Sequence, residues 1–472
     1  MLTPTANEDS RFSLWQRVRE FAVPPSMIET ATARRLVGDW AGACAAAGLD
    51  VDLNLRSVTR RHGRELAARV RADLRRLAPD LLRWHMPRIA PDGLLRPGLT
   101  VALARYDAAG RDGPDPVHLV VRTPPAWADA GQRISVALWD GSPTEAATRR
   151  HPHPHPSRRF RLDLHRHLWD ASRAGELRTR SGADRPGNDN SSATPRELPG
   201  TVPDGRRCAV DRWAAEAGIL LGAEGRRGSG GCVLVRLGGR HRLLLDLTAG
   251  SDEAGPPSVR LSDASGYGDA SVLPVLPDAA TWVPPDVELL RTGAITPDRL
   301  HPLVASALVP DHSPAVPPAS PEAAGQPRLV ECRGARHRIG LVDGVLAPLD
   351  HDPAEIRREE LLVALTGTPL PCLQAIDAAH RRPDCLPGVR ERLDHGDIAG
   401  ALAVVEGLLG PEAVLRDGPL RDELEAAAER RITYGLFREG LIGPARGPAR
   451  HRPGDLRRTH RHRSHPRHAN LR

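Results

Sequence analysis

The spacing of apolar residues changes from a helical period to a strand period and back along the chain. Apolar side chains recur at intervals of three and four residues over 28–94, which predicts helices. Short Ala-rich helices are expected from Arg34 to Ala47, on either side of Gly38-Asp39. One long helix is expected from Leu55 to Leu77, and Pro79 should end it.

From residue 98 onward, apolar positions alternate with polar ones, a pattern that predicts strands. Gly238-Gly239 and Gly334-Ala335 each separate two such runs, which indicates β-hairpins with tight turns. The predicted strands cover residues 100–106, 117–122, 134–139, 232–237, 240–247, 328–333 and 336–342. A helix is expected between these groups, from Arg212 to Leu221.

Helical spacing returns over residues 353–440. Asp352, Pro353 and Glu355 form the N-cap, first-turn proline and acidic third position that are typical of a helix start. Gly367 is expected to end this helix. Further helices are predicted over residues 370–381, 397–409 and 419–438.

Two stretches rich in Pro, Gly and polar residues separate these elements and predict linkers. The expected fold class is α+β and multi-module: a helical N-terminal part, two related small β-units, a third β-hairpin fused to a C-terminal helical bundle, and a disordered basic tail. The parts expected are an extension at 1–26, disordered if present, a helical domain at 27–95, β-unit 1 at 96–178, a linker at 179–206, β-unit 2 at 207–309, a Pro-rich linker at 310–327, the hairpin and bundle at 328–443, and the Arg/His-rich tail at 444–472.

The two β-units resemble each other in sequence. Residues 118–142 align with residues 241–265 without a gap, and eight of the 25 aligned positions are identical. Both copies end in the pattern Ser-Val-x-Leu-x-Asp-x-Ser. An ungapped match of this kind predicts an internal duplication, in which Ser135–Trp139 and Ser258–Ser262 are equivalent strands.

The composition excludes several kinds of chemistry. The chain has no lysine, so all 66 basic residues are arginine. P-loop NTPases, Schiff-base enzymes and Ser-x-x-Lys nucleophiles all require lysine and are excluded. The six cysteines lie far apart with no Cys-x-x-Cys pair, so neither a zinc ribbon nor a dithiol redox motif is expected. No cofactor is predicted.

The positive charge is concentrated at the C-terminal end. The chain of 472 residues has a net charge of +7, whereas residues 444–472 alone hold nine arginines and one aspartate. Such a segment is expected to be disordered. Any binding to nucleic acid or another polyanion is expected to lie here, through phosphates and without sequence preference. A solvated tail with no partner is the alternative. The anion-binding candidates are Arg457, Arg458, Arg461, Arg463 and Arg467.

Two further groups of charged residues are candidate binding sites. Arg60, Arg64, Arg71 and Arg75 fall on one stripe of the predicted helix over 55–77. They indicate a solvated face, or a second anion-binding site. Asp350-His351-Asp352 resembles a metal or acid–base cluster, although helix capping already accounts for Asp352 and Glu355.

Five histidines lie close together in the first β-unit. Prolines alternate with the first three, which favours an extended segment that spreads the imidazoles apart. We therefore expect a solvated tract and no stoichiometric transition metal in the purified protein, a metal site being the alternative. These histidines are His151, His153, His155, His165 and His167.

Neither a secretory leader nor an 18-residue apolar run is present, so a cytoplasmic protein without a membrane span is expected. Repeated small β-units are typical of recognition modules, which predicts a non-catalytic interaction or scaffold protein with an unknown protein partner. The alternative is a hydrolase that uses a bound metal or His/Asp side chains. The His/Asp candidates are His118 and Asp140 with their counterparts His241 and Asp263.

Overall fold

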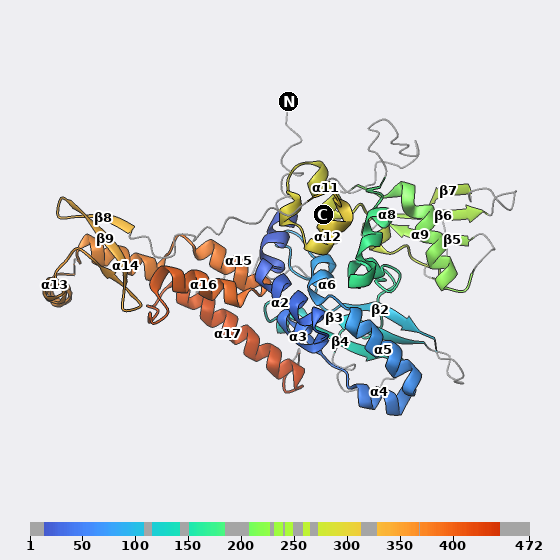
Figure 1. The fold of residues 1–472 in the computed structure, drawn as a ribbon, viewed down its shortest axis with the longest axis horizontal. Coiled ribbons are helices and arrows are strands. Elements are labelled where there is room, and N and C mark those ends of the chain that lie inside the picture. The colour runs from blue at the N-terminus through green and yellow to red at the C-terminus, as the bar shows by residue number, and fades with distance from the viewer. Residues whose placement is uncertain are drawn as a thin grey trace. The chain divides into compact units, whose positions relative to one another are not determined.

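The computed structural model describes residues 14–107, 116–141, 151–184, 207–226, 231–238, 241–248, 258–264, 272–312, 328–367 and 369–443. The chain forms two compact units. The N-terminal unit comprises Met1–Trp127, Arg133–Pro314 and Gly440–Arg472, and the C-terminal unit comprises Ala128–Gln132 and Ala315–Glu439. Helices and three small sheets make up both units, which confirms an α+β multi-module fold (Figure 1).

The first sheet has four strands in the order β1-β4-β3-β2. Strands β2 (Thr100–Tyr106), β3 (Val117–Arg122) and β4 (Ile134–Trp139) form an antiparallel meander and match the predicted strands. Strand β1 (Leu49–Val51) pairs in parallel with β4 and was not predicted. Three residues are too few to reveal a period of two.

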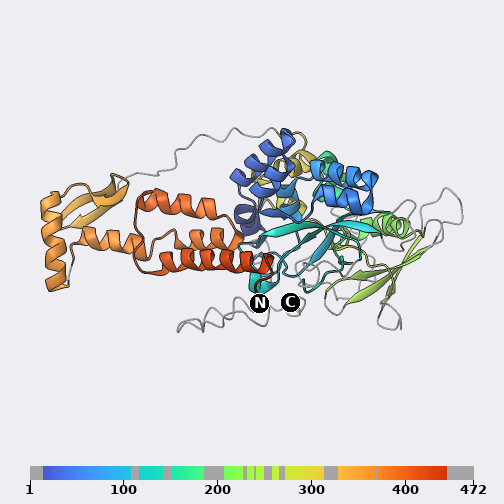
Figure 2. The same ribbon diagram turned by 90° about the horizontal axis from the view of Figure 1, so that it is seen from below.

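Helices of the N-terminal unit lie over one face of this sheet (Figure 2). The predicted single helix over 55–77 is wrong, because Gly63 adopts φ 89° and ψ 168° and divides it. A residue with that backbone conformation cannot continue a helix, and glycine adopts it without a steric penalty. The helices are α2 (Pro25–Leu36), α3 (Trp40–Ala46), α4 (Leu55–His62), α5 (Arg64–Arg76) and α6 (Pro79–His85).

The prediction of a disordered extension over 1–26 is wrong for residues 14–26, and residues 1–13 lie outside the described residues. Val18–Ala22 form a turn of π-helix. Val18 and Ala22 are fully buried in the main hydrophobic core, and Arg19 is buried with them. Arg19 pairs there with Asp286, which is 267 positions away in the sequence.

A second sheet contains β5 (Gly231–Arg236), β6 (Arg242–Thr248) and β7 (Ser258–Asp263) in that order, all antiparallel. Helix α9 (Val210–Ala223) contains the predicted helix, and its Trp213 packs in the core beside this sheet. The main core joins residues of the predicted 27–95, 96–178 and 207–309 parts. The remaining helices of this unit are α8 (Leu177–Ser181), α10 (Asp278–Thr281), α11 (Pro285–Arg291) and α12 (Pro302–Leu308).

The two β-units can be compared strand by strand. β4 and β7 cover the segments expected to be equivalent, and each pairs with the strand before it. The registers differ, however. Val121 pairs with Val136, whereas the aligned residues Leu244 and Val259 pair with Ser262 and Leu247. Strand order therefore follows the alignment but residue pairing does not, and the duplication stays a prediction.

In its described residues, the C-terminal unit combines a three-stranded antiparallel sheet with five helices (Figure 1). The predicted hairpin is present, but its turn residues are Arg333 and Gly334, with φ of 53° and 80°. The strands are β8 (Arg328–Cys332), β9 (Ala335–Val342) and β10 (Val345–Pro348), and the helices are α13 (Pro353–Thr366), α14 (Pro371–Arg381), α15 (Leu386–His395), α16 (Ile398–Leu409) and α17 (Pro419–Arg438). Strand β10 and helix α15 were not predicted.

Helices α15, α16 and α17 lie alongside one another, whereas α13 lies by the β8–β10 sheet (Figures 1 and 2). Gly367 ends α13 in the left-handed conformation, as predicted. Within the described part of the chain, no helix has the length and apolar character needed to cross a bilayer.

Candidate functional site

The histidine tract is only partly solvated. His153 and His155 are exposed, but His151, His165 and His167 are buried, so the expectation of a solvated tract is wrong for these three. His151 Nε2 lies 2.9 Å from the carbonyl oxygen of Thr123, and burial lowers the pKa of this imidazole. Among the described residues, the five imidazoles do not gather around a common point.

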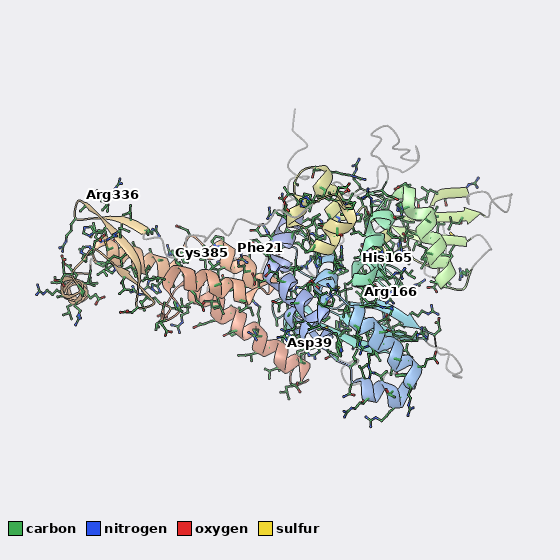
Figure 3. All side chains as sticks on the ribbon, viewed as in Figure 1. Phe21, Asp39, His165, Arg166, Arg336 and Cys385 are labelled. Carbon is green, nitrogen blue, oxygen red and sulfur yellow. The ribbon has the colours of Figure 1, made fainter. Side chains whose placement is uncertain are left out.

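His165 belongs to a buried ionic group in the N-terminal unit (Figure 3). Its Nε2 atom lies 3.2 Å from Glu216 Oε2 on α9. Arg180 of α8 donates from Nε and Nη2 to the two Glu216 oxygens, each at 2.6 Å. Burial opposes ionisation of Glu216, but His165 and Arg180 outweigh it and lower the pKa of Glu216 to about 2. This group ties α8 to α9 and leaves no carboxylate oxygen free for chemistry.

We predict that Glu216→Gln flattens the acid dependence of stability. The folded-state pKa of about 2 lies below the ordinary value of 4.5. The stabilisation is therefore complete above pH 4.5 and is lost as the pH falls towards 2. The wild type should lose about 3 kcal/mol through this group, at 1.36 kcal/mol per pKa unit. Chemical denaturation across this pH range measures the difference between the two proteins.

The matched control for Glu216→Gln is Glu176→Gln, which removes a partly exposed carboxylate that pairs with Arg173 in the same unit. An exposed pair contributes little, so this variant should follow the wild-type pH profile. Parallel profiles for the wild type and Glu216→Gln would show that the buried carboxylate does not govern acid stability.

A second buried group in the N-terminal unit contains a His/Asp pair that resembles a catalytic dyad. His301 Nε2 lies 3.0 Å from Asp80 Oδ2, and both side chains are fully buried. The Leu303 N–H donates to His301 Nδ1 at the start of α12. Both imidazole nitrogens are thus engaged, so His301 has no nitrogen available to act as a general base.

The His/Asp candidates from the sequence do not pair with each other. Asp140 lies 3.1 Å from Arg61 Nη2 and 3.6 Å from His62 Nε2. The His118 ring packs edge-on against Trp139, with 5.5 Å between ring centroids. His241 pairs with the backbone of Leu237 across the β5–β6 connection. A shared catalytic role is therefore not assembled from these residues.

Of the two arginine candidate sites, the structure describes the first and not the second. The break at Gly63 places Arg60 on α4 and Arg64, Arg71 and Arg75 on α5, so the four do not form one stripe on one helix. Residues 444–472, with the anion-binding candidates Arg457, Arg458, Arg461, Arg463 and Arg467, lie outside the described residues.

Among the described residues, a grouping of metal-ligand-type side chains lies in the C-terminal unit, and this combination was not predicted. Cys332 at the end of β8, His351 just before α13, and Cys372 at the start of α14 each offer one atom, and these atoms all lie within 4.8 Å of one another. His351 Nε2 is 3.5 Å from Cys372 Sγ. Both cysteines are fully buried and their thiols are free.

The surroundings of this Cys/His cluster orient its imidazole. His351 Nδ1 lies 3.5 Å from Glu355 Oε2, and the His337 ring stacks on the His351 ring with 4.2 Å between centroids. Arg333 donates to Glu355 Oε1 at 2.7 Å. Asp352 caps α13 by accepting from the Ala354 N–H, as predicted, whereas Glu355 contacts Arg333 and His351 instead of closing a capping box.

Helix α13 is poorly covered by the rest of its unit. No side chain from Pro353 to Val363 is fully buried, and Ile356 is the residue of this stretch that packs against the hydrophobic cluster of β8, β9 and α14. Leu361 and Leu362 are 72% and 46% exposed. A helix of this length is only marginally stable in water without packing partners. Its exposed apolar residues, Leu361 and Leu362, therefore form a candidate contact site.

Comparison with known proteins adds no relative. No family model matches the chain, and neither the curated proteins nor the solved structures contain a match.

Proposed function

We propose that this chain is a non-catalytic interaction protein, and that the C-terminal unit binds a partner protein through α13. The proposal rests on the exposure of Leu361 and Leu362, in a helix that buries no side chain fully over residues 353–363. Exposed apolar patches are found at protein contact sites. The partner's expected chemistry is an apolar groove that accepts the two leucine side chains.

The surroundings of α13 support recognition by charge as well. Arg357, Arg358 and Glu360 are exposed beside the two leucines. Charged residues around an apolar centre are typical of protein contact sites, where they fix orientation and the rate of association. A hydrolase that uses His/Asp side chains has less support, because the buried His301–Asp80 pair has both ring nitrogens engaged.

We predict that Leu361→Glu combined with Leu362→Glu weakens partner binding by about 10–100-fold, which corresponds to about 1.4–2.8 kcal/mol. A photo-reactive side chain at Arg358 would trap the partner in cells that produce the protein. The trapped protein would then be purified and its dissociation constant measured by calorimetry against wild type and variant. Light scattering of the isolated chain should give the mass of a monomer.

The matched control combines Val414→Glu with Ile432→Glu, two exposed apolar residues of the same unit that do not belong to α13. This control should bind as the wild type does. Equal loss of affinity in both double variants would contradict a site on α13. A dimer that dissociates only when Leu361 and Leu362 are replaced would identify a second copy of this chain as the occupant and overturn the proposed hetero-partner.

A further inference from the structure

We propose that Cys332, His351 and Cys372 bind one zinc ion, which fastens α13 to the sheet and to α14. The expectation of a protein without bound metal rested on the histidine tract, and these three residues belong to another part of the chain. They are 19 and 21 residues apart, and folding brings their ligand atoms together.

The donor set suits zinc. Thiolate sulfur and imidazole nitrogen are the two ligand types of protein zinc sites. With Zn–S near 2.3 Å and Zn–N near 2.0–2.1 Å, a tetrahedral centre separates a sulfur and a nitrogen by about 3.5 Å and two sulfurs by about 3.8 Å. The observed separation of Cys372 Sγ and His351 Nε2 is 3.5 Å. Three protein ligands leave a fourth position for water.

The contacts around His351 match those of a ligating histidine. Such a residue usually turns its second ring nitrogen towards a carboxylate or a carbonyl, which orients the ring and increases its basicity. Here Nε2 faces the Cys372 sulfur, and Nδ1 faces Glu355 Oε2 at 3.5 Å. The stacked ring of His337 covers one face of the imidazole. The ring is thus held with its sulfur-facing nitrogen towards the two cysteines.

Zinc binds cysteine in the thiolate form, so both thiols lose a proton when the ion enters. The exchange is balanced: Zn²⁺ displaces one proton from each thiol, and no electron transfer is involved.

The site lies in a part of the unit that has a small hydrophobic core. The hydrophobic cluster shared by β8, β9 and α14 is small, with five buried members, two of which are Cys332 and Cys372. Among the side chains of α13 that the structure describes, Ile356 packs against this cluster, as a partly buried neighbour. A metal ion would join three segments: the end of β8, the residues just before α13, and the start of α14. This link would compensate for the small core.

The test is metal analysis of the full-length, tag-free chain produced in zinc-supplemented medium and passed through gel filtration. We expect about one zinc per chain in the wild type, and loss of that zinc in Cys332→Ser and Cys372→Ser. The cobalt(II)-loaded wild type should show sulfur-to-metal charge-transfer absorption and the intense visible bands of a tetrahedral site. The serine variants should lack both. Comparing variants removes any background from the histidine tract and the tail, which all of them share.

Glu355→Gln provides a readout that does not depend on losing a ligand. Its side chain is partly exposed, so the variant should fold, and zinc affinity measured by competition with a chromophoric chelator should fall by about 10–100-fold. Cys385→Ser is the matched control. Cys385 is a free, partly buried cysteine of the same unit, next to α15. It lies away from Arg336, which belongs to the same β8–β9 hairpin as the ligand Cys332 (Figure 3). It should retain both the zinc and the cobalt spectrum.

Three results would overturn the proposal. One is a wild type that carries no zinc after purification and develops no thiolate–cobalt absorption on loading. Another is zinc content that Cys332→Ser and Cys372→Ser leave unchanged. The third is a Cys332–Cys372 disulfide in freshly purified wild type, shown by thiol counting under denaturing conditions with and without reductant. None of these bears on partner binding at Leu361 and Leu362, so the two proposals fail separately.

Discussion

Replacing Asp286 with asparagine is expected to lower the free energy of unfolding of the N-terminal unit by about 3–5 kcal/mol. Asp286 on α11 accepts from Arg19 Nε at 2.8 Å and from Arg19 Nη2 at 3.0 Å, and both side chains are almost fully buried. Trp84 Nε1 donates to the same carboxylate at 3.0 Å. The variant leaves the Arg19 guanidinium buried without a counter-charge, which is the costly outcome for an ion pair of this kind.

Chemical denaturation followed by tryptophan fluorescence would measure this effect, since the Arg19 guanidinium lies 4.1 Å from the centre of the Trp84 ring. Asp107→Asn is the control, because it removes an exposed carboxylate that pairs with Arg105. Its expected effect is within about 0.5 kcal/mol. The double variant Arg19→Met with Asp286→Leu removes both charges and should recover much of the loss. A loss below about 1 kcal/mol in Asp286→Asn would show that the pair does not hold residues 14–26 in place.

Deletion of residues 444–472 is expected to abolish binding to nucleic acid and other polyanions. This segment carries a net charge of +8, against −1 for the other 443 residues. For duplex DNA the logarithm of the binding constant falls by about 0.9 per neutralised phosphate for each tenfold rise in salt. If most of the nine arginines engage, a rise from about 50 to 200 mM salt should cost on the order of 10³–10⁵ in affinity.

Fluorescence anisotropy with duplexes of unrelated sequence would measure both the salt slope and the expected lack of sequence preference. Replacing the five anion-binding candidates by glutamine should reduce the slope in proportion to the charge removed. The thermal melt of the truncated protein should match that of the full chain. A truncated protein that binds with unchanged affinity and slope would instead assign binding to the arginines of α4 and α5.

The apolar pattern by itself determined the longer strands. Strands β2, β3 and β4 are mostly buried runs of six or seven residues between turn-forming segments, and the sequence predicted them. The ends of α13 were also predicted, because capping depends on residues close together in the sequence. The Asp352 carboxylate accepts from an N–H two residues away, and Gly367 has no side chain to oppose a left-handed conformation. Elements without such local signals were missed, as β1 with its three residues shows.

Tertiary structure alone decided which charged and polar residues are buried and which donors converge. Arg19 and Asp286 are 267 positions apart, and His165 and Glu216 are 51 apart, so no local pattern reports their pairing. The same holds for Cys332, His351 and Cys372, whose spacing fits no motif. Local sequence sets the conformation of a segment through interactions over a few residues. Pairing of buried charges and ligands depends on how elements far apart in the chain pack, which only the folded structure specifies.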